Sequence, residues 1–181
     1  QVIEAVFRRE GITVFTGTRL LDARLLGGLK EVSFEHSGET RRVLAEEILF
    51  ALGRVPNVAS LDLDQAGVQL ERGRIVTNER MQTKAPHIYA AGDCTGPHEI
   101  AHVAVRQGEI AAHNIANPDR PQRMDERLLI SLIFTEPQIA TVGLTEKRAL
   151  AEKIPCAVAR YSFGDHGKSM IMEARDGFVR L

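Results

Sequence analysis

The sequence lacks several features that would place it in a large class of proteins. None of its apolar runs approaches the ~18–20 residues that a membrane-spanning helix needs. Its 23 basic and 24 acidic residues are interspersed and leave a net charge of −1, so it has no basic stripe of the kind that binds nucleic acid. It also has no internal repeat and no low-complexity tract. The length of 181 residues fits one ordinary domain or parts of two or three domains.

Cysteine is also scarce, with two residues in 181. Cys94 and Cys156 are far apart in sequence, and no Cys-x-x-Cys or similar close pair is present. We interpret them as reduced thiols of an intracellular protein, and expect a cytoplasmic location. Cys94 directly follows Asp93, but a redox role is disfavoured because no second cysteine is near it in the sequence.

Both ends of the chain fall inside predicted secondary structure. Residues 1–11 have the apolar spacing of an amphipathic helix, with Val2, Val6 and Phe7 on one face. Residues 177–181 stop within a strand-like run. We therefore expect the chain to be a fragment of a longer protein.

The first half of the chain is predicted to contain an antiparallel meander. Its strands are expected at residues 19–26, 30–36 and 40–45, with tight turns at Gly27-Gly28 and Ser37-Gly38. A further short strand is expected at 12–16. Residues 47–52 and 88–91 are continuously apolar, which is typical of strands buried on both faces.

One long helix is predicted from about residue 99 to residue 116, because small and apolar residues recur there at helical spacing. Asn117-Pro118 ends it, and residues 118–126 are polar and resemble a linker. The other expected elements are short strands at 67–70, 74–77, 128–134, 139–144, 156–163 and 177–181, and a short helix at 145–153. These elements mix helices and strands, as α/β and α+β folds do.

A glycine and a carboxylate follow the predicted buried strand at residues 88–91. Ligands of open α/β sheets bind at the carboxyl ends of strands, where Gly92 removes a side chain and Asp93 can accept hydrogen bonds from ribose or polyol hydroxyls. The helix start near residues 99–102 offers free backbone N–H groups and a positive dipole end, which suit an electron-rich acceptor. Taken alone, Gly-Asp at a strand end is more typical of an ordinary turn.

Four motifs, in order along nearly the whole chain, extend this pattern. Residues 83–93, TKAPHIYAAGD, closely resemble the second FAD-binding motif of the class I pyridine nucleotide–disulfide oxidoreductases, a family that includes dihydrolipoamide dehydrogenase, mercuric reductase and glutathione reductase. Residues 51–57, ALGRVPN, resemble its segment leaving the NAD(P) domain. Residues 100–108, IAHVAVRQG, resemble its flavin-facing helix, and residues 134–146, FTEPQIATVGLTE, resemble the start of its dimerisation domain.

The resemblance implies an FAD site built from Gly92, Asp93, Ile100, Ala101 and His102. Asp93 falls where the family bonds the ribityl hydroxyl of the flavin, and Ala101 falls where a backbone N–H meets the flavin O2 edge. His102 matches a histidine that the family places beside the flavin helix, and we interpret it as structural rather than catalytic.

The same resemblance implies NAD or NADP as the second cofactor. Gly53 falls where family members contact NAD(P), and Arg54 beside it is a second candidate that would equally suit a structural salt bridge. Residues 1–52 would be the C-terminal part of the NAD(P)-binding domain, including the β-meander. Residues 53–122 would be the returning segment of a Rossmann-like FAD domain, and 123–181 a truncated α+β dimerisation domain.

The intact parent is then expected to transfer hydride from NAD(P)H through FAD to a disulfide or a related small-molecule acceptor. It would act as a homodimer, with neither nucleic acid nor membrane as a partner. This chain departs from the family in lacking Gly-x-Gly-x-x-Gly, the redox-active Cys-x-x-x-x-Cys and the C-terminal His-Glu pair. We therefore predict no catalytic residue in it, weak or no FAD binding by the chain alone, and no activity.

Two alternatives remain. His98-Glu99-Ile100-Ala101-His102 matches the His-Glu-x-x-His helix of zinc hydrolases. It is disfavoured because Val105 stands where glycine belongs, no third histidine follows in register, and His98 directly follows Gly96-Pro97, so we predict no metal site. The chain could otherwise be a non-catalytic module that dimerises through residues 128–181.

Overall fold

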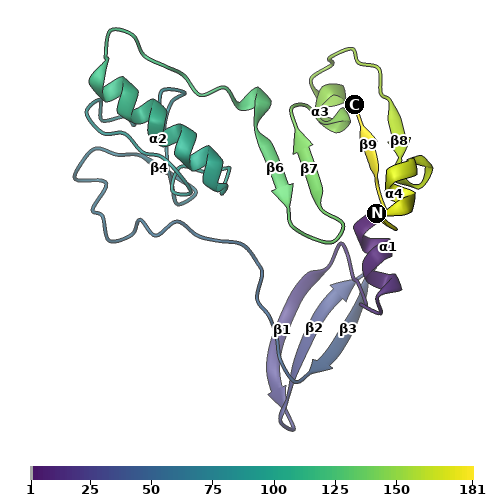
Figure 1. Ribbon diagram of the computed structural model, residues 1–181. Helices are drawn as coiled ribbons and strands as arrows, with labels where there is room; N and C mark the ends of the chain where they lie inside the picture. The colour runs from purple at the N-terminus through teal and green to yellow at the C-terminus, as the bar shows by residue number, and fades with distance from the viewer. Residues whose placement is uncertain (1) are drawn as a thin grey trace. The chain divides into compact units, whose positions relative to one another are not determined.

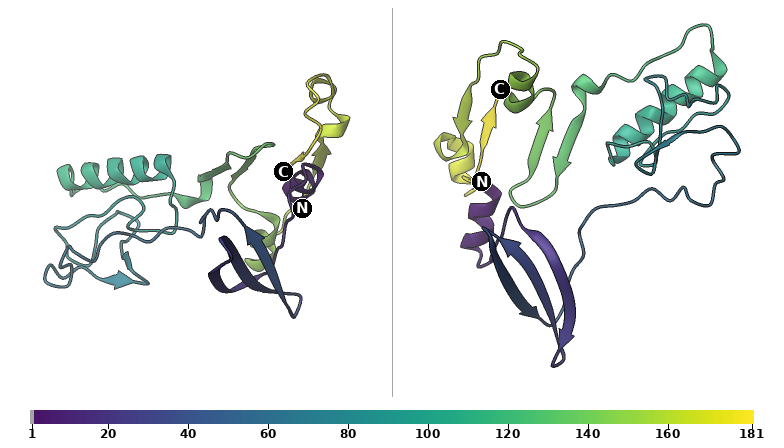
Figure 2. Two further views of the ribbon diagram at one scale, coloured as in Figure 1. Left: turned by 90° about the horizontal axis from the view of Figure 1, so that it is seen from below. Right: turned by 180° about the vertical axis from the view of Figure 1, so that it is seen from behind.

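The computed structural model describes residues 2–181, apart from the side chain of Leu128. The contacts divide the chain into two compact units, and Figures 1 and 2 draw the helices and strands of both. The first unit contains the chain up to Gly53 together with Ala159–Leu181, and the second contains Arg54–Val158. Each unit is described by itself below.

The first unit begins with helix α1, Val2–Arg9, which confirms the amphipathic helix. Val6 is its buried residue, and Glu4 pairs with Arg8 one turn later at 2.7 Å. Gly11 adopts a left-handed conformation, φ +85°, just beyond the helix end, where glycine is the favoured residue. The predicted strand at 12–16 is absent: Phe15 is held by its ring, 5.1 Å from that of Phe34, and not by a strand ladder.

The meander is confirmed almost residue for residue. It consists of β1 Arg19–Leu26, β2 Leu29–His36 and β3 Glu39–Ala45, in antiparallel order β1-β2-β3. Both predicted turns have positive φ, at Gly27 and Gly28 and at Ser37 and Gly38. The three strands lie side by side in Figure 2 because each strand pairs with the next one along the chain.

The two predicted buried strands are wrong. Residues 47–52 carry no strand assignment, and Leu49 is 92% exposed. Residues 88–91 contribute a single bridge, between Gln82 and Tyr89. A strand needs a hydrogen-bonded neighbour, and within the described residues 2–181 neither segment pairs along its length.

The second unit is built around helix α2, Ala101–Ala116, which confirms the long helix with a start two residues later than predicted. Its buried residues recur at helical spacing: Val103, Gln107, Ile110, Ala111 and Asn114. One core cluster joins α2 to Met81, and a second joins the short hairpin of β4, Leu70–Glu71, and β5, Arg74–Ile75, to Val58 and Ala85.

Shorter elements complete both units. The second unit also contains η1 Glu126–Leu128, the hairpin of β6 Ile130–Ile133 and β7 Ile139–Val142, and α3 Glu146–Ala151. The first unit also contains the pair β8 Arg160–Ser162 and β9 Phe178–Arg180, with η2 Phe163–Asp165 and α4 Gly167–Ile171 between them. No helix among the described residues is long and apolar enough to cross a membrane.

Candidate functional site

The loop between residue 91 and α2 is held by a side chain that the sequence patterns did not single out. Gln107 is buried on α2, and its Oε1 accepts a hydrogen bond of 2.7 Å from the Gly92 backbone N–H. The Thr95 hydroxyl donates to the Gly92 carbonyl at 2.9 Å. The available signal was a polar residue at helical spacing with apolar ones, which predicts a buried hydrogen bond once the helix face is known.

The glycine at position 92 is explained by its backbone conformation. Its φ is +86°, in the left-handed region that disfavours side chains. An added Cβ would meet the Ala104 Cβ at 3.5 Å, which is ordinary contact. Gly92 therefore allows the chain to turn sharply, so that Asp93 follows directly after the turn.

Asp93 and Arg54, two of the predicted site residues, lie together. The Arg54 Nη2 is 3.2 Å from Asp93 Oδ2, and the Asp93 side chain is 41% exposed. Such an exposed pair contributes about 0–1 kcal/mol at most. The carboxylate is therefore accessible, and one of its oxygens already has a cationic partner. Gly53, with φ +104°, is an exposed residue at the end of the first unit.

The start of α2 has the geometry of an anion- or dipole-binding end. Ile100 is the N-cap residue, in an extended conformation, and it provides no side-chain cap. The first helical hydrogen bond runs from the Ala104 N–H to the Ile100 carbonyl at 3.0 Å. The N–H groups of Ala101, His102 and Val103 thus have no intrahelical acceptor, and the exposed Ala101 has no bulky side chain to cover them.

The His102 ring is directed toward β6. Its Nε2 lies 2.9 Å from the Ile130 carbonyl oxygen, and it lines a hollow of about 320 Å³ with Arg106, Arg123 and Asp125 among others. The His102 ring therefore has a structural partner in the described chain. At Asp125, which lines the same hollow, hydrogen bonds from the Arg127 side chain, and then from its backbone N–H, lower the pKa of the carboxyl to about 2.

The zinc-motif alternative fails on helix register. His98 and Glu99 precede α2, which begins at Ala101, so the two histidines do not share one helix face. Glu99 is paired instead with Arg74, Oε1 to Nη2 at 2.8 Å. Within residues 2–181 no three histidine, cysteine or acidic side chains are grouped to hold a metal ion.

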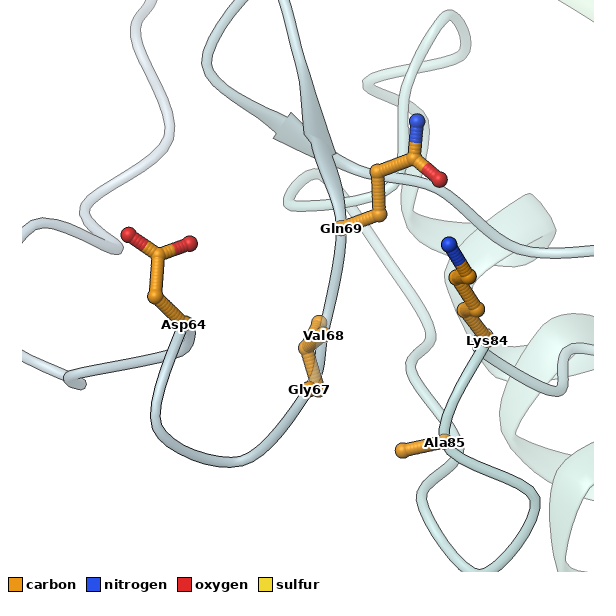
Figure 3. A pocket seen from close by; sticks show the side chains of 6 residues that line it. All are labelled: Asp64, Gly67, Val68, Gln69, Lys84 and Ala85. Carbon is orange, nitrogen blue, oxygen red and sulfur yellow. The ribbon is translucent and has the colours of Figure 1, made fainter.

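A second hollow lies near the β4 end of the hairpin and is not lined by any of the predicted cofactor residues. Its lining residues are Asp64, Gly67, Val68, Gln69, Lys84 and Ala85, around an open space of about 530 Å³. In Figure 3 the Lys84 ammonium and the Gln69 amide extend to the same side, while the Asp64 carboxylate lies apart from both. The hollow therefore lacks converging charged groups.

Comparison with known proteins gives the family to which this chain belongs. Residues 1–108 match the family described as pyridine nucleotide-disulphide oxidoreductase, and residues 130–181 match the dimerisation domain of the same family. The chain therefore belongs to the pyridine nucleotide–disulphide oxidoreductase family, and the resemblance drawn from the four motifs is confirmed.

The relatives are similar along almost the whole chain. It is 34% identical to a dihydrolipoyl dehydrogenase of Bacillus subtilis over 181 residues, and 36% identical to one of Mycobacterium tuberculosis over 180 residues. These alignments cover 99% of this chain but only 38% and 39% of the relatives. The chain thus spans less than half the length of the curated relatives it matches.

Solved structures agree on the fold. LpdA from Mycobacterium tuberculosis has a TM-score of 0.85 at 30% identity, covering 99% of this chain and 38% of its own. The flavoprotein disulfide reductase RclA from Escherichia coli has a TM-score of 0.82 at 20% identity, covering 99% and 40%, which shows the fold alone. The predicted partial α/β and α+β fold is confirmed.

Proposed function

We propose that the protein to which these residues belong is an FAD-dependent oxidoreductase that passes hydride from NADH or NADPH, through the flavin, to a disulfide or related acceptor. The observation that carries the proposal is the juxtaposition of an accessible carboxylate, Asp93, with a loop that Gln107 ties to α2, whose N-terminus is uncapped. The relatives named dihydrolipoyl dehydrogenase support it.

The described residues fit a flavin by the chemistry of their donors and acceptors. The Asp93 carboxylate would accept a hydrogen bond from the ribityl chain of the flavin. It retains this capacity while it is paired with Arg54, since an ionised carboxylate has several lone-pair positions. The N–H of Ala101 and the positive end of the helix dipole would suit the electron-rich edge of the ring, and Ile100 and His102 would be the neighbouring contacts. The flavin, when bound, supplies the hydride chemistry.

For the nicotinamide cofactor we propose Gly53 and Arg54 as contacts at the end of an NAD(P)-binding segment formed by residues 1–52. The positive φ of Gly53 supports a turn in which the backbone is open to a ligand. Residues 53–122 would form the FAD segment and 123–181 the interface domain; the family match that begins at residue 130 supports the latter.

We assign no catalytic side chain among these residues. Cys94 and Cys156 are both free thiols, and no redox-active pair is formed within the described chain. The isolated 181-residue chain is therefore expected to be inactive and to bind FAD weakly or not at all. Its free thiols also support the proposal of a cytoplasmic location.

We further propose that the intact protein is a homodimer. The match of residues 130–181 to a dimerisation domain supports this. Exposed apolar side chains on and beside β6 and β7, at Ile133, Phe134 and Val142, are a surface that a second subunit would cover.

The test is the absorbance spectrum of the purified full-length protein, followed by anaerobic titration with NADH and with NADPH. A bound flavin that one of the two nucleotides bleaches stoichiometrically is the expected result. A full-length protein without flavin that sediments as a dimer would contradict the proposal and favour the non-catalytic module.

A further inference from the structure

Arg74 lies across the loop that leads to α2. It belongs to β5, whose neighbouring Ile75 N–H donates to the Cys94 carbonyl at 2.8 Å, so the β4–β5 hairpin is bonded to this loop. The Arg74 Nη2 reaches Glu99 Oε1 at 2.8 Å, with side-chain exposures of 31% and 22%. This pair is the less exposed kind of ion pair, which water screens less than a surface one.

Gly96 makes room for the guanidinium. A Cβ built on Gly96 would lie 1.9 Å from Arg74 Nη1 and 2.5 Å from its Cδ. The arginine therefore occupies the volume that any side chain at position 96 would take. The φ of Gly96, +48°, lies in the left-handed region, which disfavours a side chain there independently.

The second terminal nitrogen of the Arg74 guanidinium, Nη1, makes the side chain more dependent on its ion pair with Glu99. Nη1 is buried and finds no hydrogen-bond partner within the described residues. An arginine with one buried, unpaired nitrogen that lost Glu99 as well would have lost the one ion-pair partner that the described residues give it, which is unfavourable. The pair thus fixes three segments together: the hairpin, the Gly96 turn and the residues just before Ala101.

We propose that Arg74 and Glu99 are positioning residues for the N-terminus of α2, and that they set both the affinity and the reduction potential of the flavin; this rests on the proposed function. Glu99 stands two residues before Ala101, whose N–H faces the flavin edge in that proposal. Arg74 neutralises the Glu99 carboxylate at that end. Freed of Arg74, Glu99 would place an unpaired negative charge near the ring, and this opposes formation of an anionic reduced flavin.

The experiment compares full-length protein carrying Arg74→Met, Glu99→Gln or the exchange Arg74→Glu/Glu99→Arg. The matched control is Glu109→Gln, which breaks the Arg106–Glu109 pair of 2.9 Å further along α2. We expect Arg74→Met to weaken FAD binding roughly tenfold, as loss of a partly buried pair implies. It should also lower the midpoint potential, while Glu99→Gln raises it and the exchange restores affinity toward wild type.

Opposite shifts of the midpoint potential in Arg74→Met and Glu99→Gln separate an effect of the pair on the flavin from mere stabilisation of the fold. A loss of stability alone would not shift the potential in opposite directions in the two variants. Equal potentials in Arg74→Met, Glu99→Gln and wild type would overturn the inference. Gly96→Ala should displace the guanidinium without changing any charge, and should weaken FAD binding in the same way.

Amide hydrogen exchange of residues 94–101 in the flavin-free protein separates this inference from the proposed function. If wild-type protein binds no FAD, the proposed function fails. The Arg74–Glu99 ion pair would still predict faster amide exchange in Arg74→Met than in Glu109→Gln. Unchanged exchange in Arg74→Met would show that the pair braces nothing.

Discussion

Helix α2 and the segments at 47–52 and 88–91 have equally clear apolar patterns, yet only the helix forms. A helix satisfies its backbone hydrogen bonds within itself, so α2 needs neighbours only to bury the face that contains Val103 and Ile110. A strand must obtain its hydrogen bonds from another strand. In this chain the helix satisfies its own hydrogen bonds and forms as predicted, whereas these two segments have no strand partner along their length among the described residues.

The meander supports this explanation from the side of the strands. β1, β2 and β3 pair with their immediate neighbours through two tight turns, and they form as predicted. They differ from residues 47–52 in having a pairing partner one tight turn away along the chain.

The largest expected effect comes from contrasting the two regions directly. Ile110 is fully buried on α2, and Ile110→Ala should lower the free energy of unfolding of the 181-residue chain by about 2–5 kcal/mol. Leu49→Ala, at an exposed position in 47–52, should change it by less than about 0.5 kcal/mol. Urea unfolding measures both. A large loss for Leu49→Ala would mean that residues 47–52 are packed after all.

The next largest loss of stability is expected from a substitution of Asn114, a buried polar residue of α2. Asn114 donates to the carbonyls of Arg80 and Gln122, and it accepts from the Gln122 N–H at 2.7 Å. Asn114→Ala leaves these buried groups unpaired and should cost about 1–3 kcal/mol in urea unfolding. The exposed Asn57 serves as the control, and Asn57→Ala should be nearly neutral.

Helix α3 tests whether a hydrogen bond between residues close in sequence also stabilises the end of a helix. The Thr145 hydroxyl accepts from the Arg148 N–H at 3.3 Å as an N-cap. Thr145→Ala should destabilise the chain by about 1 kcal/mol, whereas Thr145→Ser should retain most of the stability. Equal unfolding curves for the two variants would show that the cap contributes nothing.

The smallest effect is electrostatic. The pKa of Asp125 is lowered from 3.8 to about 2 in the folded chain by its hydrogen bonds with Arg127. Because the folded pKa is the lower one, its stabilising contribution is present above about pH 4 and is lost as the pH falls toward 2. Titration of the Asp125 carboxyl by NMR measures this directly. A midpoint near 3.8, or no change on Arg127→Met, would contradict it.

The local features of the candidate site could be predicted from the sequence, whereas the contacts between distant residues could not, for a physical reason. The turn at Gly92, the carboxylate at Asp93 and the helix start near Ala101 are local features that a short motif specifies. The ion pair from Arg54 to Asp93 and the hydrogen bond from Gln107 to Gly92 join residues 39 and 15 positions apart, and the motif carries no information about them. The same holds for Arg74 and Glu99, since the sequence around Glu99 matches a zinc motif and indicates no ion pair with Arg74.

The most direct test of the central claim is the dissociation constant for FAD of the full-length protein with Asp93→Ala, beside Asp64→Ala as an exposed acidic control in the same unit. Loss of a hydrogen bond to a charged acceptor should weaken binding by about 1.5–3 kcal/mol, or roughly 10- to 150-fold, with Asp64→Ala unchanged. Equal FAD affinity in wild type and Asp93→Ala would contradict the account.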